Sequence, residues 1–170
     1  NANGAVTIKG GELLKLDGDN IIDARIVPDT NGINGKIEFT GGATIMKPVG
    51  DHNLEFNVVK FTTDNTKVVT LNDAIHAQNI EFGESTVKAN AAGITLNGEI
   101  TTNGTSFDVS GSSLTVTSNV TDISVNKEVT VKGDNALIFD GNNVINAKLM
   151  PEITDSSALR FTGEPVLNYE

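Results

Sequence analysis

Short runs of alternating apolar and polar residues occur along the whole chain, and each run ends at Gly, Asn or Asp within a few positions. Alternation with a period of two places successive side chains on opposite faces of an extended strand, so the pattern predicts many short β-strands. No window of about 15 residues keeps the apolar spacing of an amphipathic helix. The fold class is therefore predicted to be all-β. The clearest predicted strands are Val6–Ile8, Lys36–Phe39, Leu54–Val58, Ile94–Leu96, Ser113–Val116 and Glu128–Val131.

An internal duplication is the strongest signal in the sequence. Of the 24 positions from Ala5 to Pro28, 11 are identical to the residue 123 positions further along the chain. After a deletion of one residue the match resumes, with Ile37–Gly41 facing Leu159–Gly163. Residues 5–41 therefore resemble residues 128–163, and we treat 1–170 as one domain with an internal repeat.

Shorter and weaker repeats occur within the 123-residue period. A triplet of an apolar residue, a charged residue and Phe recurs as Ile37–Phe39, Leu54–Phe56, Ile80–Phe82 and Leu159–Phe161. The spacings are irregular, and they suggest coils of about 20 to 25 residues, which lies in the range of solenoid repeats. Stacked short strands with turns at Gly, Asn and Asp predict a parallel β-helix of seven or eight coils.

The alternative fold is an antiparallel β-sandwich. Asn-Gly pairs such as Asn97-Gly98 and Asn103-Gly104 are typical of hairpin turns, which would join antiparallel strands. A sandwich of this kind could serve as a stalk. It gives no reason for a duplication of 123 residues, whereas an open stack of coils does, so the sequence favours the solenoid.

Charge and composition exclude several classes of protein. The chain has 170 residues, 12 Lys and Arg against 22 Asp and Glu, and a net charge of −10. Such an acidic chain is not expected to bind nucleic acid or anionic membranes, because both need a basic surface. With no Cys, disulfide scaffolds and thiol chemistry are absent. No apolar run is long enough to cross a membrane, and the first residue is Asn, so we expect a cut or processed piece.

The repeat unit resembles the passenger regions of autotransporters, and more narrowly those of the rickettsial surface cell antigens. The residues that carry the resemblance are the strand Val6–Gly10 with its mate Val129–Gly133, the turn Asp17–Ala24 and the closing Phe39–Gly41. The likeness is one of composition and pattern over the whole chain. It implies a right-handed parallel β-helix at the cell surface, exported across the outer membrane and used in adhesion to or invasion of host cells. The implied partner is a host cell-surface protein or matrix component.

The sequence offers little for catalysis. His52 and His76 are the two histidines, and neither lies in a known catalytic motif. Alternation places His76 opposite Ile75, so we expect it to face solvent. With no Trp and one Tyr, the aromatic platform that polysaccharide-processing enzymes use is missing, and the Phe residues are expected in the core. We therefore expect no enzyme, no cofactor and no metal, with a polysaccharide-processing β-helix as the least favoured alternative.

Two acidic turn residues, Asp17 and Asp19, are candidates for an acid/base pair or a calcium site. They lie beside Gly and Asn, where Asp side chains usually hydrogen-bond turn backbone, and the second copy has Asn142 in place of Asp19. We therefore expect these residues to stabilise a turn.

Recognition is expected where the repeat pattern breaks, because loops carry binding while coils carry stability. The segments that break it are 28–35, 47–53 and the Ser-rich edge 106–118. The residues chosen as binding candidates are Asp29, Asn31, Asn34, His52 and Asn53. A spacer without a ligand of its own is the alternative. The chain is expected to be a monomer, with end-to-end association through its terminal coils, since solenoid ends normally need caps.

Overall fold

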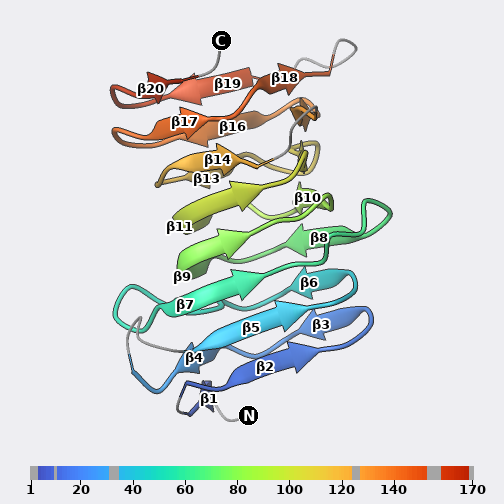
Figure 1. The fold of residues 1–170 in the computed structure, drawn as a ribbon, viewed down its shortest axis with the longest axis vertical. Helices are drawn as coiled ribbons and strands as arrows, with labels where there is room; N and C mark the ends of the chain where they lie inside the picture. The colour runs from blue at the N-terminus through green and yellow to red at the C-terminus, as the bar shows by residue number, and fades with distance from the viewer. Residues whose placement is uncertain (1–3, 10, 31–34, 124–126, 153–157, 169–170) are drawn as a thin grey trace.

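The computed structural model describes residues 4–9, 11–30, 35–123, 127–152 and 158–168, and it contains strands, turns and no helix in these ranges. The strands form sheets of two, seven and eleven strands, and three of the eleven branch from the main path of the largest sheet. Every pairing between named strands in the described ranges is parallel. The chain is therefore a parallel β-solenoid, as the repeat predicts, and the antiparallel sandwich is wrong (Figure 1).

The register of the strand pairs divides the solenoid into three faces, which the chain visits in the order face 1, face 2, face 3. Face 1 contains β1 (Val6–Ile8), β4 (Ile26–Pro28), the bridge residue Val49, the beginnings of β9 (Ile75–Glu81) and β11 (Ile94–Thr102), β13 (Leu114–Val116), β16 (Ala136–Phe139) and β19 (Ala158–Phe161).

Face 2 contains β2 (Leu13–Leu16), β5 (Lys36–Phe39), β7 (Phe56–Lys60), the ends of β9 and β11, β14 (Val120–Asp122), β17 (Val144–Asn146) and β20 (Val166–Leu167). Face 3 contains β3 (Asn20–Ile22), β6 (Ala43–Ile45), β8 (Val68–Leu71), β10 (Thr86–Ala89), β12 (Ser106–Asp108), β15 (Val129–Lys132) and β18 (Leu149–Pro151). Because β9 and β11 continue from face 1 into face 2, these two faces merge into one sheet in the middle of the rod.

Coil length follows from one column of paired residues on face 1. The inward residues of this column are Val6, Ile26, Val49, Ile75, Leu96, Val116, Phe139 and Phe161. Successive members are 20, 23, 26, 21, 20, 23 and 22 residues apart, which gives seven coils in the predicted range of lengths. The longest interval, from Val49 to Ile75, contains two of the loops described below.

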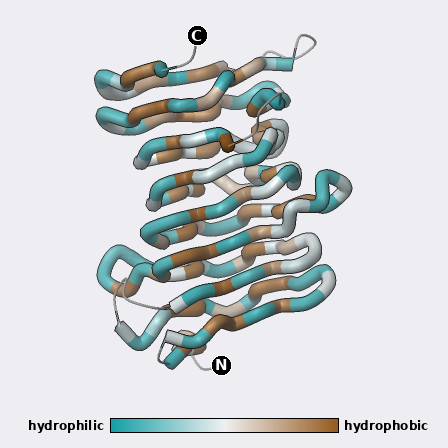
Figure 2. Tube along the Cα trace, viewed as in Figure 1, coloured by the Kyte–Doolittle hydropathy of each residue, from teal (hydrophilic) through white to brown (hydrophobic). Residues whose placement is uncertain are grey.

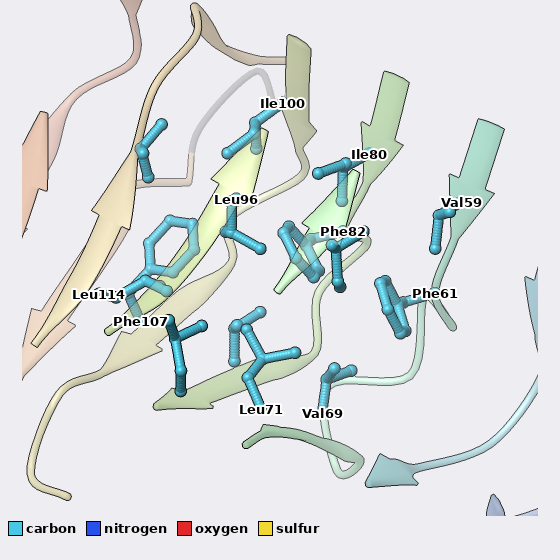
Figure 3. Packing of buried hydrophobic residues seen from close by; sticks show 14 of the residues in the cluster. Val59, Phe61, Val69, Leu71, Ile80, Phe82, Leu96, Ile100, Phe107 and Leu114 are labelled. Atoms are coloured by element: carbon cyan, nitrogen blue, oxygen red, sulfur yellow. The ribbon is translucent and has the colours of Figure 1, made fainter. Parts of the chain in front are cut away.

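The core is a set of like-on-like columns between coils. On face 2 the column Ile37, Val59, Ile80 and Ile100 is fully buried. Beside it, Phe61 stacks between two other rings, at 4.9 Å from Phe39 and 5.1 Å from Phe82. Figure 3 shows Phe61 and Phe82 side by side in the core. In strands such as β5, β10 and β13, buried apolar residues alternate with more exposed ones, and much of the corner surface is polar (Figure 2). Six of the seven Phe residues are at most 1% exposed, which confirms their predicted place in the core.

Charged residues alternate in sign along the outer surface of face 2. Lys15, Glu38, Lys60 and Glu81 occupy neighbouring positions in successive coils. Each side chain therefore has an opposite charge in the next coil, which favours this register. This register corrects the predicted triplet pattern. The segment that lies between Ile37–Phe39 and Ile80–Phe82 in the stack is Val59–Phe61, and not Leu54–Phe56. The predicted strand Leu54–Val58 is correspondingly two residues too early, since β7 is Phe56–Lys60.

The two copies of the duplication occupy different faces. Val6 lies on face 1 and its mate Val129 lies on face 3, while Leu14 lies on face 2 and its mate Leu137 lies on face 1. Each strand of the second copy therefore lies on the face that precedes, in chain order, the face of its mate in the first copy. The reason is that 123 residues, at about 22 residues per coil, span roughly 5.6 coils and not a whole number.

Most exposed large apolar side chains lie in the first and last coils. They are Val6, Leu13 and Ile21 in the first coil and Met150, Phe161, Val166 and Leu167 in the last. These residues have a neighbouring coil on one side only. End-to-end association through these coils stays a prediction.

Substituting the middle ring of the Phe stack tests this core. We expect Phe61→Ala to lower the free energy of unfolding by about 3 to 5 kcal/mol, because it empties a fully buried site between two rings. Phe161→Ala is the matched control, since Phe161 stacks on Phe139 from one side only and is 36% exposed. Urea denaturation followed by circular dichroism measures both. Equal losses for the two variants would contradict the assigned packing.

Candidate functional site

Two of the pattern-breaking segments have their described residues, 28–30 and 35 in one and 50–53 in the other, at the same corner between face 1 and face 2, in successive coils. One joins β4 to β5, and the other runs from Gly50 to Glu55 before β7. Hydrogen bonds fix both segments to neighbouring coils. The Gly50 N–H donates to the Ile26 carbonyl at 2.7 Å, and the Asn57 N–H donates to the Gly35 carbonyl at 2.9 Å. The register therefore brings together two loops that the sequence separates by some 20 residues.

The second loop is a tight turn, which we call the histidine turn, residues 51–54. It projects at the left of the rod in Figure 1, ahead of β7. Asp51 and Leu54 exchange two backbone hydrogen bonds, of 3.1 and 3.2 Å. The Asp51 Oδ1 also accepts the N–H groups of Asn53 and Leu54, both at 2.8 Å, while its Oδ2 pairs with Arg25. Asp51 thus holds the turn closed and ties it to the coil below, leaving His52 and Asn53 exposed at the tip.

The histidine turn folds back onto β9. The imidazole rings of His52 and His76 lie 4.5 Å apart between centroids, at an interplanar angle of 65°. His76 points outward from face 1, as alternation predicts, yet it is only 7% exposed. The expectation that His76 faces solvent is therefore wrong. The physical reason is that the turn from the preceding coil lies over the ring, which a pattern within one strand cannot reveal.

A hydrogen-bonded row continues from His76 into the next two coils. The Asn97 amide nitrogen lies 3.1 Å from the His76 Nδ1, and the Asn97 Oδ1 accepts the Thr117 hydroxyl at 2.8 Å. An amide NH₂ can only donate, so the Nδ1 accepts and carries no proton in this arrangement. The row therefore favours a neutral His76.

Electrostatics act in the same direction. Burial lowers the pKa of His76 below its ordinary value, and positive charge on His52 lowers this pKa further. The carboxylates of Glu55 and Asp73 raise it, with smaller effect. Two imidazoles in contact thus disfavour the doubly protonated state.

The structure places three of the five candidate binding residues. Asp29, His52 and Asn53 are exposed at the corner between faces 1 and 2. Asn31 and Asn34 lie outside the described residues. Sequence reasoning missed His76 and Asn97, which support the histidine turn from below. The feature that points to this site is the length of one coil. The interval from Val49 to Ile75 is the longest in the face 1 column, and it contains the extra residues of the turn that covers His76.

The acidic turn residues Asp17 and Asp19 stabilise contacts between coils. The Asp17 Oδ1 accepts the Thr40 hydroxyl at 3.0 Å, and the Asp19 Oδ1 accepts the Gly42 N–H at 2.7 Å and the Lys67 amine at 2.9 Å. Their carboxylates therefore hold the turns of the next coils, rather than only their own turn.

The second copy makes the same contacts at its own corner. The Asp140 Oδ1 accepts the Thr162 hydroxyl at 2.5 Å, and the Asn142 Oδ1 accepts the Glu164 N–H at 3.1 Å. Asn142 replaces Asp19 because the position needs an oxygen acceptor and not a charge. This equivalence favours a structural role for the Asp pair over an acid/base role.

A close glycine pair accompanies these contacts in both copies. A Cβ at Gly41 would lie 2.4 Å from the Gly18 carbonyl oxygen, and a Cβ at Gly163 would lie 2.2 Å from the Gly141 carbonyl oxygen. Gly18 and Gly141 have φ angles of 75° and 108°. Such angles and approaches need glycine, so the duplicated sequence encodes a complete corner.

Grooves on the outer surface carry ion pairs rather than isolated carboxylates. A groove of about 490 Å³ on face 3 is lined by Thr44, Val68 and Thr70, and its one acidic residue, Asp19, is paired with Lys67. A general acid needs a carboxyl whose pKa is raised, whereas the hydrogen bond from Lys67 lowers the pKa of Asp19. No aromatic side chain lines this groove.

Among the described residues, no three His, Cys, Asp or Glu side chains come together in a way that could hold a metal ion. In this same part of the chain no helix has the length and apolar character needed to span a membrane. No family model, curated protein or solved structure matches the chain.

The role of Asp19 can be tested with two substitutions. We expect Asp19→Asn to keep more thermal stability than Asp19→Ala, because Asn retains the acceptor for Gly42 while both variants lose the Lys67 ion pair. The pKa of Asp19 is lowered, chiefly by the Lys67 hydrogen bond, so its contribution is full above pH 3.8 and is lost as the pH falls below that value. Thermal unfolding at pH 7 and pH 3 measures this. Equal stability of the two variants at pH 7 would contradict the assigned hydrogen bond.

Proposed function

We propose that the chain is a non-enzymatic module of a bacterial cell-surface autotransporter passenger, and that it contributes to adhesion to or invasion of host cells. The observation that carries this proposal is the joint placement of Asp29, His52 and Asn53 on one corner of an otherwise regular solenoid. A rigid scaffold with loops gathered on one side is a common arrangement for recognition. The partner is a host cell-surface protein or matrix component, and the module acts outside the outer membrane.

The chemistry of the corner supports a protein partner. It presents a carboxylate, an imidazole and an amide within two adjacent loops, with Arg25 held beside them by Asp51. Such mixed polar groups form directed hydrogen bonds with a protein surface. The acidic chain disfavours nucleic acid as a partner.

A spacer without a ligand of its own is the second candidate. It is favoured by the regular parallel pairing of β11, β13, β14, β16 and β17. The two functions differ in whether the corner loops matter for binding.

Binding of the fluorescently labelled chain to cultured mammalian cells tests the proposal. We expect saturable binding above that of an unrelated acidic β-protein, and at least a tenfold loss in the variant Asp29→Ala, His52→Ala, Asn53→Ala. The matched control changes Thr63, Asp64 and Asn65 to Ala. These residues lie in an exposed loop before β8, and the substitutions remove the same charge.

The outcomes separate the candidates. Saturable binding that is lost in the first variant and kept in the control supports an adhesive corner. Binding equal to that of the unrelated protein overturns adhesion by this module and favours the spacer. Equal loss in both variants contradicts the assignment of the corner.

A further inference from the structure

The histidine turn packs one ionisable side chain onto another of the same charge type. His52 and His76 are in ring contact, and the charged form of each is the same cation. The turn approaches β9 closely. A Cβ at Gly50 would lie 2.1 Å from the His76 carbonyl oxygen, so the turn is seated on the strand with no space between them.

Carboxylates and an uncharged amide surround the histidine pair. Glu55 from the same loop and Asp73 from the corner before β9 are the nearest carboxylates, and Asp51 is engaged by Arg25 and by the turn backbone. On the next strand, Asn97 is uncharged and donates to the His76 Nδ1. The two carboxylates favour protonation of His76, but burial and His52 oppose it more strongly, since the net effect lowers its pKa.

We propose that the histidine turn is an acid-operated cover, which lies closed over β9 when the two imidazoles are neutral and detaches when both are protonated. Protonation of His76 at Nδ1 removes the acceptor for Asn97 and places two cations in contact. Opening lets both rings gain water and separates their charges. The turn keeps its own shape, because the Asp51 hydrogen bonds that close it do not involve imidazole.

The direction of the pH effect follows from linkage. The closed state holds an imidazole whose pKa is lowered, while the open state holds one near the ordinary value of 6.5. The closed state is therefore fully favoured above that value and loses stability as the pH falls through the interval below it. Opening exposes His76 and Asn97 on the outer surface of face 1.

Hydrogen–deuterium exchange of the full chain, read by mass spectrometry between pH 8 and pH 5 and corrected for intrinsic exchange rates, measures the opening. We expect protection of residues 50–55 to fall at least tenfold at pH 5. The loop 62–67 is the internal control, because it contains no histidine and the pKa of Asp64 is lowered, so its charges do not change in this range. Imidazole NMR signals report the titration of His76, whose pKa is expected to lie below its ordinary value.

Two variants make the test specific. His52→Gln removes one cation, so the turn should stay protected at pH 5 and the pKa of His76 should rise. His76→Gln keeps a polar side chain beside Asn97 and should also keep the turn closed. Circular dichroism at pH 8 verifies that both fold.

Three results would overturn the proposal. They are equal protection of residues 50–55 at pH 8 and pH 5, the same acid-induced opening in both variants, and a loss of protection that spreads over the whole chain. These measurements report only whether the turn is closed or open. A failure to bind cells would leave them unchanged, so the two proposals, the acid-operated cover and the adhesive corner, are tested independently.

Discussion

Contact between successive coils is the constraint on which the whole structure depends. A coil of some 22 residues is too thin to bury its own apolar side chains, so each inward residue is covered by the same position of the coils above and below. The column Ile37, Val59, Ile80 is buried completely for this reason, and Phe61 is covered by a ring on each side. Register is therefore the main quantity that the sequence has to encode, and it does so with like apolar residues inside and alternating charges outside.

The two copies of the duplicated segment lie on different faces of the solenoid, which shows that the three faces make similar demands on the sequence. The same segment forms a strand of face 1 as Val6–Ile8 and a strand of face 3 as Val129–Lys132. Both strands present apolar residues at alternate positions to a narrow core, and that is the main demand a face makes. What the duplicated segment carries with it is the corner, since the contact of Asp17 with Thr40 is repeated by Asp140 and Thr162 between different faces. The unit of the repeat is thus a corner with its flanking strands, and not a coil.

Sequence patterns predicted the strands, the parallel stacking and the coil length, because these depend on local alternation and on self-similarity. They misplaced β7 by two residues, since Leu54–Phe56 imitates the triplet that Val59–Phe61 fills with the opposite charge. The face of each repeat copy could not be predicted, because it depends on the summed lengths of all intervening corners. Exposure of His76 was mispredicted for a related reason. Alternation tells on which side of a strand a residue lies, whereas the burial of His76 depends on His52, 24 residues earlier in the chain.

Corners are where a solenoid can take extra residues without disturbing its ladders, so insertions such as 50–55 cost the core little. An insertion that merely projects would share no group with the coils. The histidine turn instead returns to the surface of β9 and joins the row of His76, Asn97 and Thr117. Its position therefore depends on the same coil-to-coil register as the core, and Asp51 adds a second tie to the coil below through Arg25. A loop held at two levels of the stack presents its tip in a fixed place, which is the property that the proposed recognition role requires of it.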